Sequence, residues 1–314
     1  MAVKTTFSKE DFDKILSQYE LGAFKSLTPF EKGAVQTNIL IETTKGRFVF
    51  RYYETRPKDY ALFEVELLDY LTKHFYPCPT PIENKNGMFL GEYYDKPFAF
   101  IKFMEGEHSE SRENHKKIAN AIGQLHEITI GYKPEHYKAR DTYDPTSSLN
   151  NAELNSQKIK SELKAKERLE WLSVELRKVE IPDDLPKGVC HCDTHPSNFL
   201  YKNGEISAVL DFDDASYVCL LYDNANMIYF WAWPEKEEIN FDRAREILKE
   251  YSSYRVLTKP EKEHLYDLLK MVNFMSIGWF IDSDNFEWEK ERIEQLNAMG
   301  RKEFYNKMFG HLPL

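Results

Sequence analysis

Three side chains near the middle of the sequence could together transfer a phosphoryl group. Asp193 precedes Asn198, and Asp211 follows at the end of an apolar run. A kinase needs a carboxylate that accepts the proton of the attacking hydroxyl, and oxygen ligands that hold magnesium on the nucleotide phosphates. We assign the first task to Asp193 and magnesium binding to Asn198 and Asp211, because Mg²⁺ prefers oxygen ligands and is usually held by one or two carboxylates and substrate phosphates.

The residues between Asn198 and Asp211 give a structural reason for their spacing. Residues 199–201 and 206–210 have the composition of short apolar strands. The Asn-Gly dipeptide at 203–204 is typical of a tight hairpin turn. Single Asp and Asn residues are most often turn or cap residues, but a hairpin here would return Asp211 to the end at which Asn198 lies. The ordered set therefore indicates a kinase.

The same stretch could also be interpreted as a metal cluster. It holds Cys190, His191, Cys192, Asp193 and His195. Structural zinc sites generally space their cysteines by two to four residues and add a second pair elsewhere. Here one residue separates the cysteines, and the remaining two, Cys78 and Cys219, are isolated. We therefore predict that Cys190 and Cys192 pack around the loop as small side chains.

The motif His-x-Asp-x-x-x-x-Asn, followed by a hairpin and Asp-Phe-Asp, resembles that of the aminoglycoside phosphotransferase and choline kinase superfamily. Among its members, the sequence is most similar to bacterial homoserine kinases of the second type, in phrases such as Tyr-Pro-Cys-Pro-Thr-Pro at 76–81 and Leu-Pro-Lys-Gly-Val at 185–189. The resemblance implies an α+β, bilobal, protein-kinase-like fold. Residues 1–103 would form a small antiparallel-sheet lobe that binds ATP, and residues 104–314 a mainly helical lobe for catalysis and the acceptor.

Two phrases beside the catalytic residues depart from the homoserine kinases. That family carries Leu-Phe-Pro-Asp where this chain has residues 194–197, and an aromatic pair where it has Asp213 and Asp214. Homoserine is the first expected acceptor, and an aminoglycoside or another amino alcohol is the alternative. For an acceptor with an ammonium group, we expect Asp213 or Asp214 to bind the cation with Trp231 packed nearby, and His195 to lie at the acceptor site.

The resemblance also implies that Arg51 binds the nucleotide phosphates. This residue lies in a predicted strand, 47–53, at the position where kinases place a lysine, and its forked donors suit phosphate. The family pairs such a cation with a glutamate of the following helix, predicted here at 60–73. Glu64 is the expected partner, and Glu66 is the alternative.

Two further segments are expected to contact the nucleotide. Residues 31–36 occupy the place of a kinase's glycine-rich loop but contain a single glycine, so an ordinary turn is the favoured interpretation. Residues 98–104 form an apolar run that corresponds to the last strand of the small lobe and the hinge. Adenine would be held there by the carbonyl of Lys102 and the amide of Met104.

Hydrophobic periodicity predicts the remaining elements. We expect helices at 8–19, 115–129, 155–179, 222–233, 241–254, 259–281 and 285–309, and further strands at 27–30 and 37–43. His126, on the second of these helices, is expected to be a structural residue. Asp223 matches the family's aspartate that supports the catalytic loop from behind.

Composition fits a soluble enzyme of two lobes. The chain has 314 residues and a net charge of −10 without a long basic run, which argues against a nucleic acid or an anionic membrane as partner. No segment has the apolar length of a membrane span, and the N-terminus lacks a signal-peptide pattern. Cysteines without a pairing pattern predict a cytoplasmic location. The expected partner is a small-molecule hydroxyl acceptor, and the sequence carries no signal of oligomeric state.

Two alternatives belong to other functional classes. A degenerate kinase fold could bind a nucleotide without turnover, as the sparse glycine loop and the arginine in place of lysine would allow. Retention of Asp193, Asn198 and Asp211 argues for catalysis instead. Protein-kinase activity is less favoured, because no Ala-Pro-Glu phrase follows Asp211.

Overall fold

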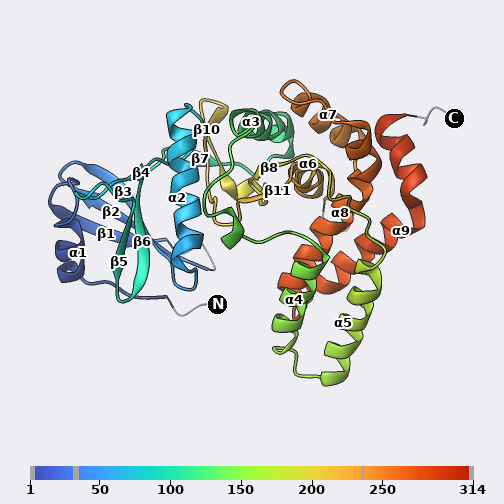
Figure 1. Cartoon of the computed structure of the whole chain (residues 1–314), viewed down its shortest axis with the longest axis horizontal. Coiled ribbons are helices and arrows are strands. Elements are labelled where there is room, and N and C mark those ends of the chain that lie inside the picture. Colours follow the sequence, from blue (N-terminus) through green and yellow to red (C-terminus); the bar gives the residue numbers. More distant parts are fainter. Residues whose placement is uncertain (1–3, 31–34, 235–236, 311–314) are drawn as a thin grey trace. The chain divides into compact units, whose positions relative to one another are not determined.

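The computed structural model describes residues 4–30, 35–234 and 237–310. They form two compact units, coloured along the sequence in Figure 1. The first unit comprises the described residues of Met1–Ser109, Pro134–Arg140 and Ser197–Asp213, and the second comprises those of Glu110–Lys133, Asp141–Pro196 and Asp214–Leu314. The predicted division at residue 103 follows the order of the chain, whereas these units interleave along it. The lobe boundary stays a prediction.

An antiparallel sheet forms the centre of the first unit (Figure 1). Its strands, in chain order, are β1 (Phe24–Pro29), β2 (Thr37–Thr43), β3 (Gly46–Tyr52), β4 (Pro81–Ile82), β5 (Leu90–Tyr93) and β6 (Lys96–Lys102). The spatial order is β1-β2-β3-β6-β4, with β5 also paired to β6. The strand predicted at 37–43 is confirmed, and the neighbouring predicted strands are confirmed with shifted ends.

Two helices accompany this sheet. Helix α1 (Lys9–Leu16) lies within the helix predicted at 8–19, and the side chain of Ser8, its N-cap, accepts from the amide of Asp11 in a capping box. Phe12 of α1 belongs to the same buried cluster as Phe50 of β3. Helix α2 (Lys58–Lys73) packs on β4, β5 and β6.

A second, smaller sheet of the first unit carries the hairpin predicted from the Asn-Gly dipeptide. Strands β9 (Phe199–Lys202) and β10 (Glu205–Val209) pair antiparallel, and β7 (Glu107–His108) pairs with β9. Asn203 and Gly204 have φ angles of 54° and 82°. Two consecutive positive φ angles are typical of the type I′ turn, whose twist matches that of the strands.

The second unit is mainly helical (Figure 1). Its α-helices are α3 (His115–Ile128), α4 (Pro145–Ser156), α5 (Glu162–Leu176), α6 (Leu221–Met227), α7 (Phe241–Tyr251), α8 (Lys259–Phe280) and α9 (Asn285–Phe309). Helix α8 packs against α4, α6 and α9 and is largely buried. A short antiparallel pair, β8 (Lys187–Cys190) and β11 (Ser216–Cys219), lies among these helices. The α+β fold class is thereby confirmed.

The single helix predicted at 155–179 is wrong. Helix α4 begins already after Asp144, whose side chain caps it, and ends at Ser156. Helix α5 starts anew after Ser161, which accepts from the amide of Lys164. A serine that can cap a following turn favours a new N-terminus over continuation of the previous helix.

The helix predicted at 222–233 is confirmed only in its first half. After α6 the backbone widens into a π-helical segment at Ile228–Ala232, here called the π segment. Such widened turns are frequent at functional sites. Helix α9 spans the predicted residues, but Gly300, at φ 73° and ψ 160°, interrupts its helical geometry.

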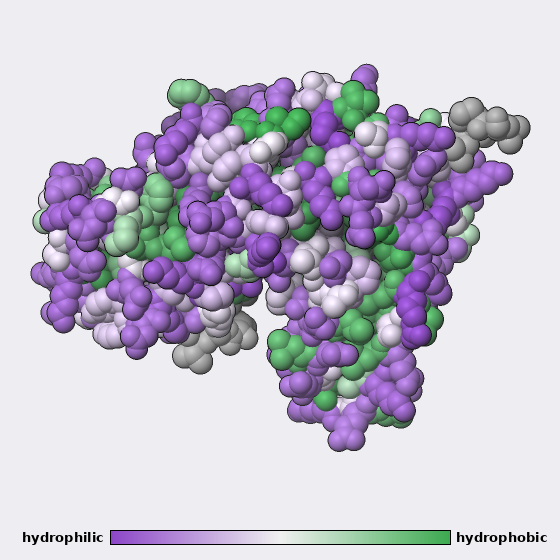
Figure 2. All heavy atoms as spheres, in the orientation of Figure 1, coloured by the Kyte–Doolittle hydropathy of each residue, from purple (hydrophilic) through white to green (hydrophobic). Residues whose placement is uncertain are grey.

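Hydrophilic and apolar residues are distributed unevenly over the face of the molecule seen in Figure 2. Figure 2 shows hydrophilic residues over most of the visible surface, with apolar ones gathered in the region of α4 and α5. Leu154 and Leu163 are among the exposed residues of that region. Across the parts of the chain described here, the helices lack the combined length and apolar character that spanning a membrane requires.

Candidate functional site

Arg51 and Glu64 form an ion pair in the first unit. Side chains alternate along a strand, so Arg51 points to the face of β3 opposite Phe50, which packs with α1. Its Nε lies 3.3 Å from Oε1 of Glu64, and both side chains are buried, at 8% and 2% exposure. The hydroxyl of Tyr53 donates to the other Glu64 oxygen at 3.0 Å.

Glu66, the alternative partner, does not contact Arg51. Its carboxylate lies 3.0 Å from Nδ1 of His136, at 31% exposure. Two positions along a helix place side chains on different faces, so only one of the two glutamates can face the sheet. The structure therefore assigns the pairing to Glu64.

Charge around Arg51 sets the protonation of this cluster. Burial alone would lower the pKa of Arg51, but the carboxylates of Glu64, Asp211 and Asp213 raise it further above its usual range. Burial raises the pKa of Glu64, and the Arg51 guanidinium opposes that shift. Arg51 therefore carries its positive charge at every pH at which the protein is folded.

Asn198 and Asp211 flank the β9–β10 hairpin, as predicted. The amide of Leu210 donates to the carbonyl of Asn198 at 2.8 Å, which joins the two ends of the hairpin. The Asp211 side chain is 50% exposed, and its Oδ1 lies 3.2 Å from Nη2 of Arg51. Its φ of 58° is in the left-handed region, which aspartate tolerates better than most residues. An amide oxygen and a carboxylate in this arrangement are suitable ligands for a hard divalent cation.

Asp213 has other partners than the sequence suggested. One carboxylate oxygen lies 3.2 Å from Nη2 of Arg51 and accepts from Nε2 of Gln36 at 3.3 Å. The other accepts from Nη2 of Arg56 at 3.0 Å. Burial raises the pKa of Asp213, but the guanidinium groups of Arg51, Arg56 and Arg140 outweigh it and lower that pKa. An ammonium of the acceptor would compete with Arg51 and Arg56 for Asp213, and the acceptor-binding role of Asp213 stays a prediction.

The backbone around Asp213 is also fixed. Arg140 donates to the carbonyls of Tyr60, Phe212 and Asp213 and stacks on the Tyr60 ring at 3.6 Å. Asp214 begins the next segment of the second unit; it is half-buried, and its carbonyl accepts from the hydroxyl of Tyr143 at 2.9 Å. The role of Asp214 in acceptor binding stays a prediction.

Asp193 lies in the second unit, in the loop that follows β8. Asp223, at the start of α6, holds this loop: its two oxygens accept from the amides of His191 and Cys192, each at 2.8 Å. Asp223 is fully buried. The predicted support of the loop from behind is confirmed. Asp193 itself is half-buried, and its Oδ1 accepts from the amide of His195 at 3.3 Å.

His126 is a structural residue, as predicted. Its ring nitrogens lie 2.7 Å from the Tyr251 hydroxyl and 3.1 Å from Asp223 Oδ2. Burial would lower the pKa of His126, but Asp223 and Cys190 outweigh burial and raise that pKa to about 9.

The metal interpretation of the cysteine-rich stretch gains no support from this cluster. Among the described residues, Cys190 groups with His126 and Asp223 rather than with its sequence neighbours. Asp223 already accepts two backbone amides. We therefore interpret the cluster as a hydrogen-bonded support for the loop.

Trp231 packs behind the catalytic loop. It is fully buried, and its indole N–H donates to the carbonyl of Thr194 at 2.7 Å. Asn226 of α6 accepts from both the amide and the hydroxyl of Thr194, each at 2.7 Å. The exposed ring of His195 contacts Phe230 edge-on at 5.2 Å. The π segment thus holds the loop at Thr194, and the expected place of Trp231 beside the acceptor stays a prediction.

The predicted adenine-binding residues lie at the end of β6. The amide of Lys102, the last residue of the strand, donates to the carbonyl of Thr80 at 2.8 Å. Met104 follows outside the strand and is half-buried. Whether the backbone here binds adenine stays a prediction. Of the expected glycine-loop segment, residues 31–34 lie outside the described residues.

Several partners in this region were missed by the sequence interpretation. They are Gln36, Asn38, Arg56 and Arg140 in the first unit and Asn226 in the second. Asn38 contacts Arg51 across neighbouring strands, the other four lie farther along the chain from the residues they contact, and no local motif marks any of them.

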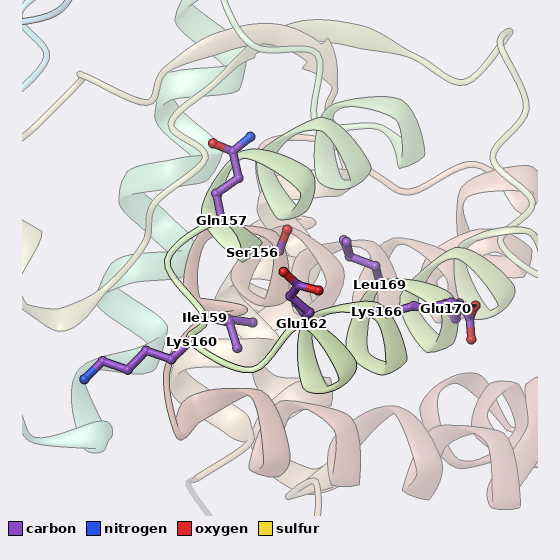
Figure 3. A pocket seen from close by; sticks show the side chains of 9 residues that line it. Ser156, Gln157, Ile159, Lys160, Glu162, Lys166, Leu169 and Glu170 are labelled. Atoms are coloured by element: carbon purple, nitrogen blue, oxygen red, sulfur yellow. Dashed lines mark ion pairs between the residues drawn. The ribbon is translucent and has the colours of Figure 1, made fainter.

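An open pocket of about 540 Å³ lies elsewhere, where α4 ends and α5 begins (Figure 3). Its lining combines apolar Ile159 and Leu169 with charged residues such as Lys160, Lys166 and Glu170. None of the predicted site residues contributes to it, and we assign it no ligand.

Comparison with known families and proteins points to one kind of activity. The model of a phosphotransferase enzyme family matches residues 26–257. A homoserine kinase of Rhizobium meliloti (strain 1021) is 28% identical over 270 residues, which cover 84% of this chain and 81% of that protein. A homoserine kinase of Methylocella silvestris is 28% identical over 290 residues, 89% of each chain.

Solved structures share the fold at lower identity. An amicoumacin kinase in complex with AMP-PNP, Ca²⁺ and Ami superimposes with a TM-score of 0.71 at 19% identity, covering 96% of this chain and 94% of that one. A microcompartment-associated aminopropanol kinase gives a TM-score of 0.69 at 15% identity, with 96% and 99% coverage. A spectinomycin phosphotransferase gives 0.62 at 12% identity, covering 98% of each.

Proposed function

Since the chain belongs to the phosphotransferase enzyme family, we propose that it transfers the γ-phosphoryl group of ATP to the hydroxyl of homoserine, forming O-phosphohomoserine and ADP. The reaction class rests on the family. The acceptor rests on the homoserine kinases that resemble most of the chain's length. One structural observation carries the site: Asn198 and Asp211 flank one hairpin, and Asp211 contacts the buried Arg51.

Each of the proposed site residues has a separate role in the in-line transfer of the phosphoryl group. Asp193 accepts the proton of the acceptor hydroxyl. The hydroxyl oxygen then bonds to the γ-phosphorus, while the bond between the γ-phosphorus and the oxygen that bridges to the β-phosphate breaks and ADP leaves. Arg51 binds the phosphates, and Glu64 orients Arg51. Catalysis is then mainly positioning and charge neutralisation. The backbone at Lys102 and Met104 is our proposed adenine contact.

The exposed carboxylate of Asp211 and the amide oxygen of Asn198 match the oxygen ligands that Mg²⁺ prefers. When bound there, Mg²⁺ neutralises charge on the phosphates. A kinase of the same fold was solved in complex with AMP-PNP and Ca²⁺, which supports an adenine nucleotide and a divalent cation as ligands.

We place the enzyme in the cytoplasm. Cys78, Cys190, Cys192 and Cys219, which all lie within the described residues, form no disulfide, which fits a reducing compartment.

A coupled assay of ADP release tests this function. Mg-ATP is offered with L-homoserine, 1-amino-2-propanol, choline and a panel of aminoglycosides, and Asp193→Asn serves as the blank. Asp193-dependent turnover on homoserine is expected. Turnover confined to another acceptor would assign the enzyme to amino alcohols or aminoglycosides, for which the aminopropanol kinase fold is the supporting observation. ATP binding without turnover on any acceptor would support the non-catalytic alternative.

A further inference from the structure

Arg51 lies among three carboxylates that differ in their surroundings. Glu64 lies 3.3 Å from its Nε, whereas Asp211 and Asp213 each lie 3.2 Å from the same nitrogen, Nη2. The Glu64 and Asp213 side chains are 2% and 9% exposed, and that of Asp211 is 50% exposed. Two of the acids are therefore buried partners of the guanidinium, and one is open to solvent.

Arg56 holds the carboxylate oxygen of Asp213 that does not contact Arg51. Arg56 donates to its second oxygen through Nε at 3.3 Å and Nη2 at 3.0 Å, and the hydroxyl of Tyr60 donates to its carbonyl at 2.8 Å. The Arg56 guanidinium stacks on the Tyr60 ring at 4.1 Å. Two donors from one planar guanidinium hold a carboxylate with defined geometry, so Asp213 presents its first oxygen to Arg51 at a fixed place.

A buried guanidinium needs its compensating charges, because removing one partner leaves an uncompensated ion. Asp211 is the acid that our proposed function gives to the metal. While Asp211 ligates a cation, its pairing with Arg51 is weakened, and Glu64 holds only the Nε side. The Nη2 side then depends on Asp213.

We propose that Asp213 is a positioning residue, which keeps Nη2 of Arg51 in place for the nucleotide phosphate when Asp211 exchanges Arg51 for Mg²⁺. The inference rests on the proposed function. The same inference assigns a role to Arg56, which would hold Asp213 in place and would not bind the nucleotide. It also explains why an acid follows Asp211 so closely in the sequence.

Asp213→Asn tests the exchange, because the amide keeps the shape and removes the charge. Arg51 then pairs more strongly with Asp211, which competes with the cation. We expect the Kd of Mg-ATP, measured by isothermal titration calorimetry, to rise about tenfold. Binding of Mn²⁺ in the presence of ATP, followed by electron paramagnetic resonance, is expected to weaken several-fold. The acceptor KM is expected to stay unchanged.

Arg56→Gln separates positioning from a general change of charge. Loss of a positive charge alone would strengthen Mn²⁺ binding. Loss of the anchor of Asp213 is expected to weaken Mg-ATP binding several-fold, and Arg56→Lys is expected to restore part of it. Arg56 is 16% exposed, so this variant carries the test even if Asp213→Asn does not fold.

Asp69→Asn is the matched control, since Asp69 pairs with the exposed Lys73 on α2. It is expected to bind Mg-ATP and Mn²⁺ like the wild type. Unchanged binding in Asp213→Asn, or stronger Mn²⁺ binding in Arg56→Gln, would overturn the proposal.

Because these readouts need no acceptor, a wild type that binds Mg-ATP but phosphorylates none of the tested acceptors refutes the proposed function alone. A wild type that does not bind Mg-ATP overturns both.

Discussion

Oε1 of Glu64 lies 3.3 Å from Nε of Arg51, with both side chains buried. The pair joins helix α2 to strand β3 and so fixes the helix against the sheet. In water such a pair would contribute little, but in a buried position the loss of either partner leaves a desolvated charge. The same contact therefore bears on stability and on the orientation of the proposed phosphate ligand.

Glu64→Gln is expected to destabilise the protein by about 3 kcal/mol, because the buried guanidinium of Arg51 loses a charged partner. Urea unfolding measures the change. Glu66→Gln is the matched control on the same helix, since Glu66 pairs with the partly exposed His136 and its loss should cost at most about 1 kcal/mol. Equal effects of the two substitutions would show that Arg51 is compensated by its other partners.

Asp193→Asn is expected to lower kcat by roughly 10²- to 10⁴-fold, the range for loss of a general base. The Kd of ATP and the urea midpoint should change little, because the Asp193 carboxylate is half-buried and the loop is held by Asp223. Asp183→Asn, at an exposed acid of the same unit, is the control. A loss of activity below tenfold would remove Asp193 from the role of base.

Local signals in the sequence predicted the parts of the fold that neighbouring residues determine. The Asn-Gly dipeptide predicted the β9–β10 hairpin because two positive φ angles are needed in its turn, and the structure has them at Asn203 and Gly204. The start of the helix predicted at 8–19 also agrees with the structure, where the Ser8 side chain caps the first turn of α1. In both cases the determining interaction spans a few residues.

At 155–179 the helix-cap signal was overlooked because the apolar periodicity favoured one continuous helix. The apolar periodicity there continues through the point at which α4 ends and α5 begins. Ser161 is a cap signal that the periodicity obscured. The π segment at 228–232 leaves no local mark at all, since its widened turn depends on packing with other helices.

Long-range contacts explain why the ion pairs of Asp213 could not be predicted. From sequence, Asp213 has the appearance of an unpaired acid beside the motif. Its partners Gln36, Arg51 and Arg56 lie more than 150 residues earlier in the chain. A single sequence holds no information on which cation will pair with which carboxylate across such a distance, so only the structure could identify the partners of Asp213.

Trp231→Phe is expected to lower kcat about five- to tenfold while leaving the acceptor KM within twofold. The substitution keeps an aromatic ring but removes the indole N–H that donates to the Thr194 carbonyl beside Asp193, at a stability cost of about 1 to 2 kcal/mol. Trp233→Phe is the control, because its indole N–H donates to Glu237 instead. A large change in acceptor KM without a change in kcat would place Trp231 at the acceptor site.

The His126–Asp223 contact predicts how stability depends on pH. The pKa of His126 is about 9 in the folded protein and about 6.5 in an unfolded chain. A pKa raised by folding contributes stability that is fully present below the unfolded value and is lost as pH rises through the folded value. We therefore expect the free energy of unfolding to fall by on the order of 3 kcal/mol between about pH 6.5 and 9.5, measured by urea unfolding at each pH. His126→Gln should flatten this slope, whereas an unchanged slope in the variant would assign it to other groups.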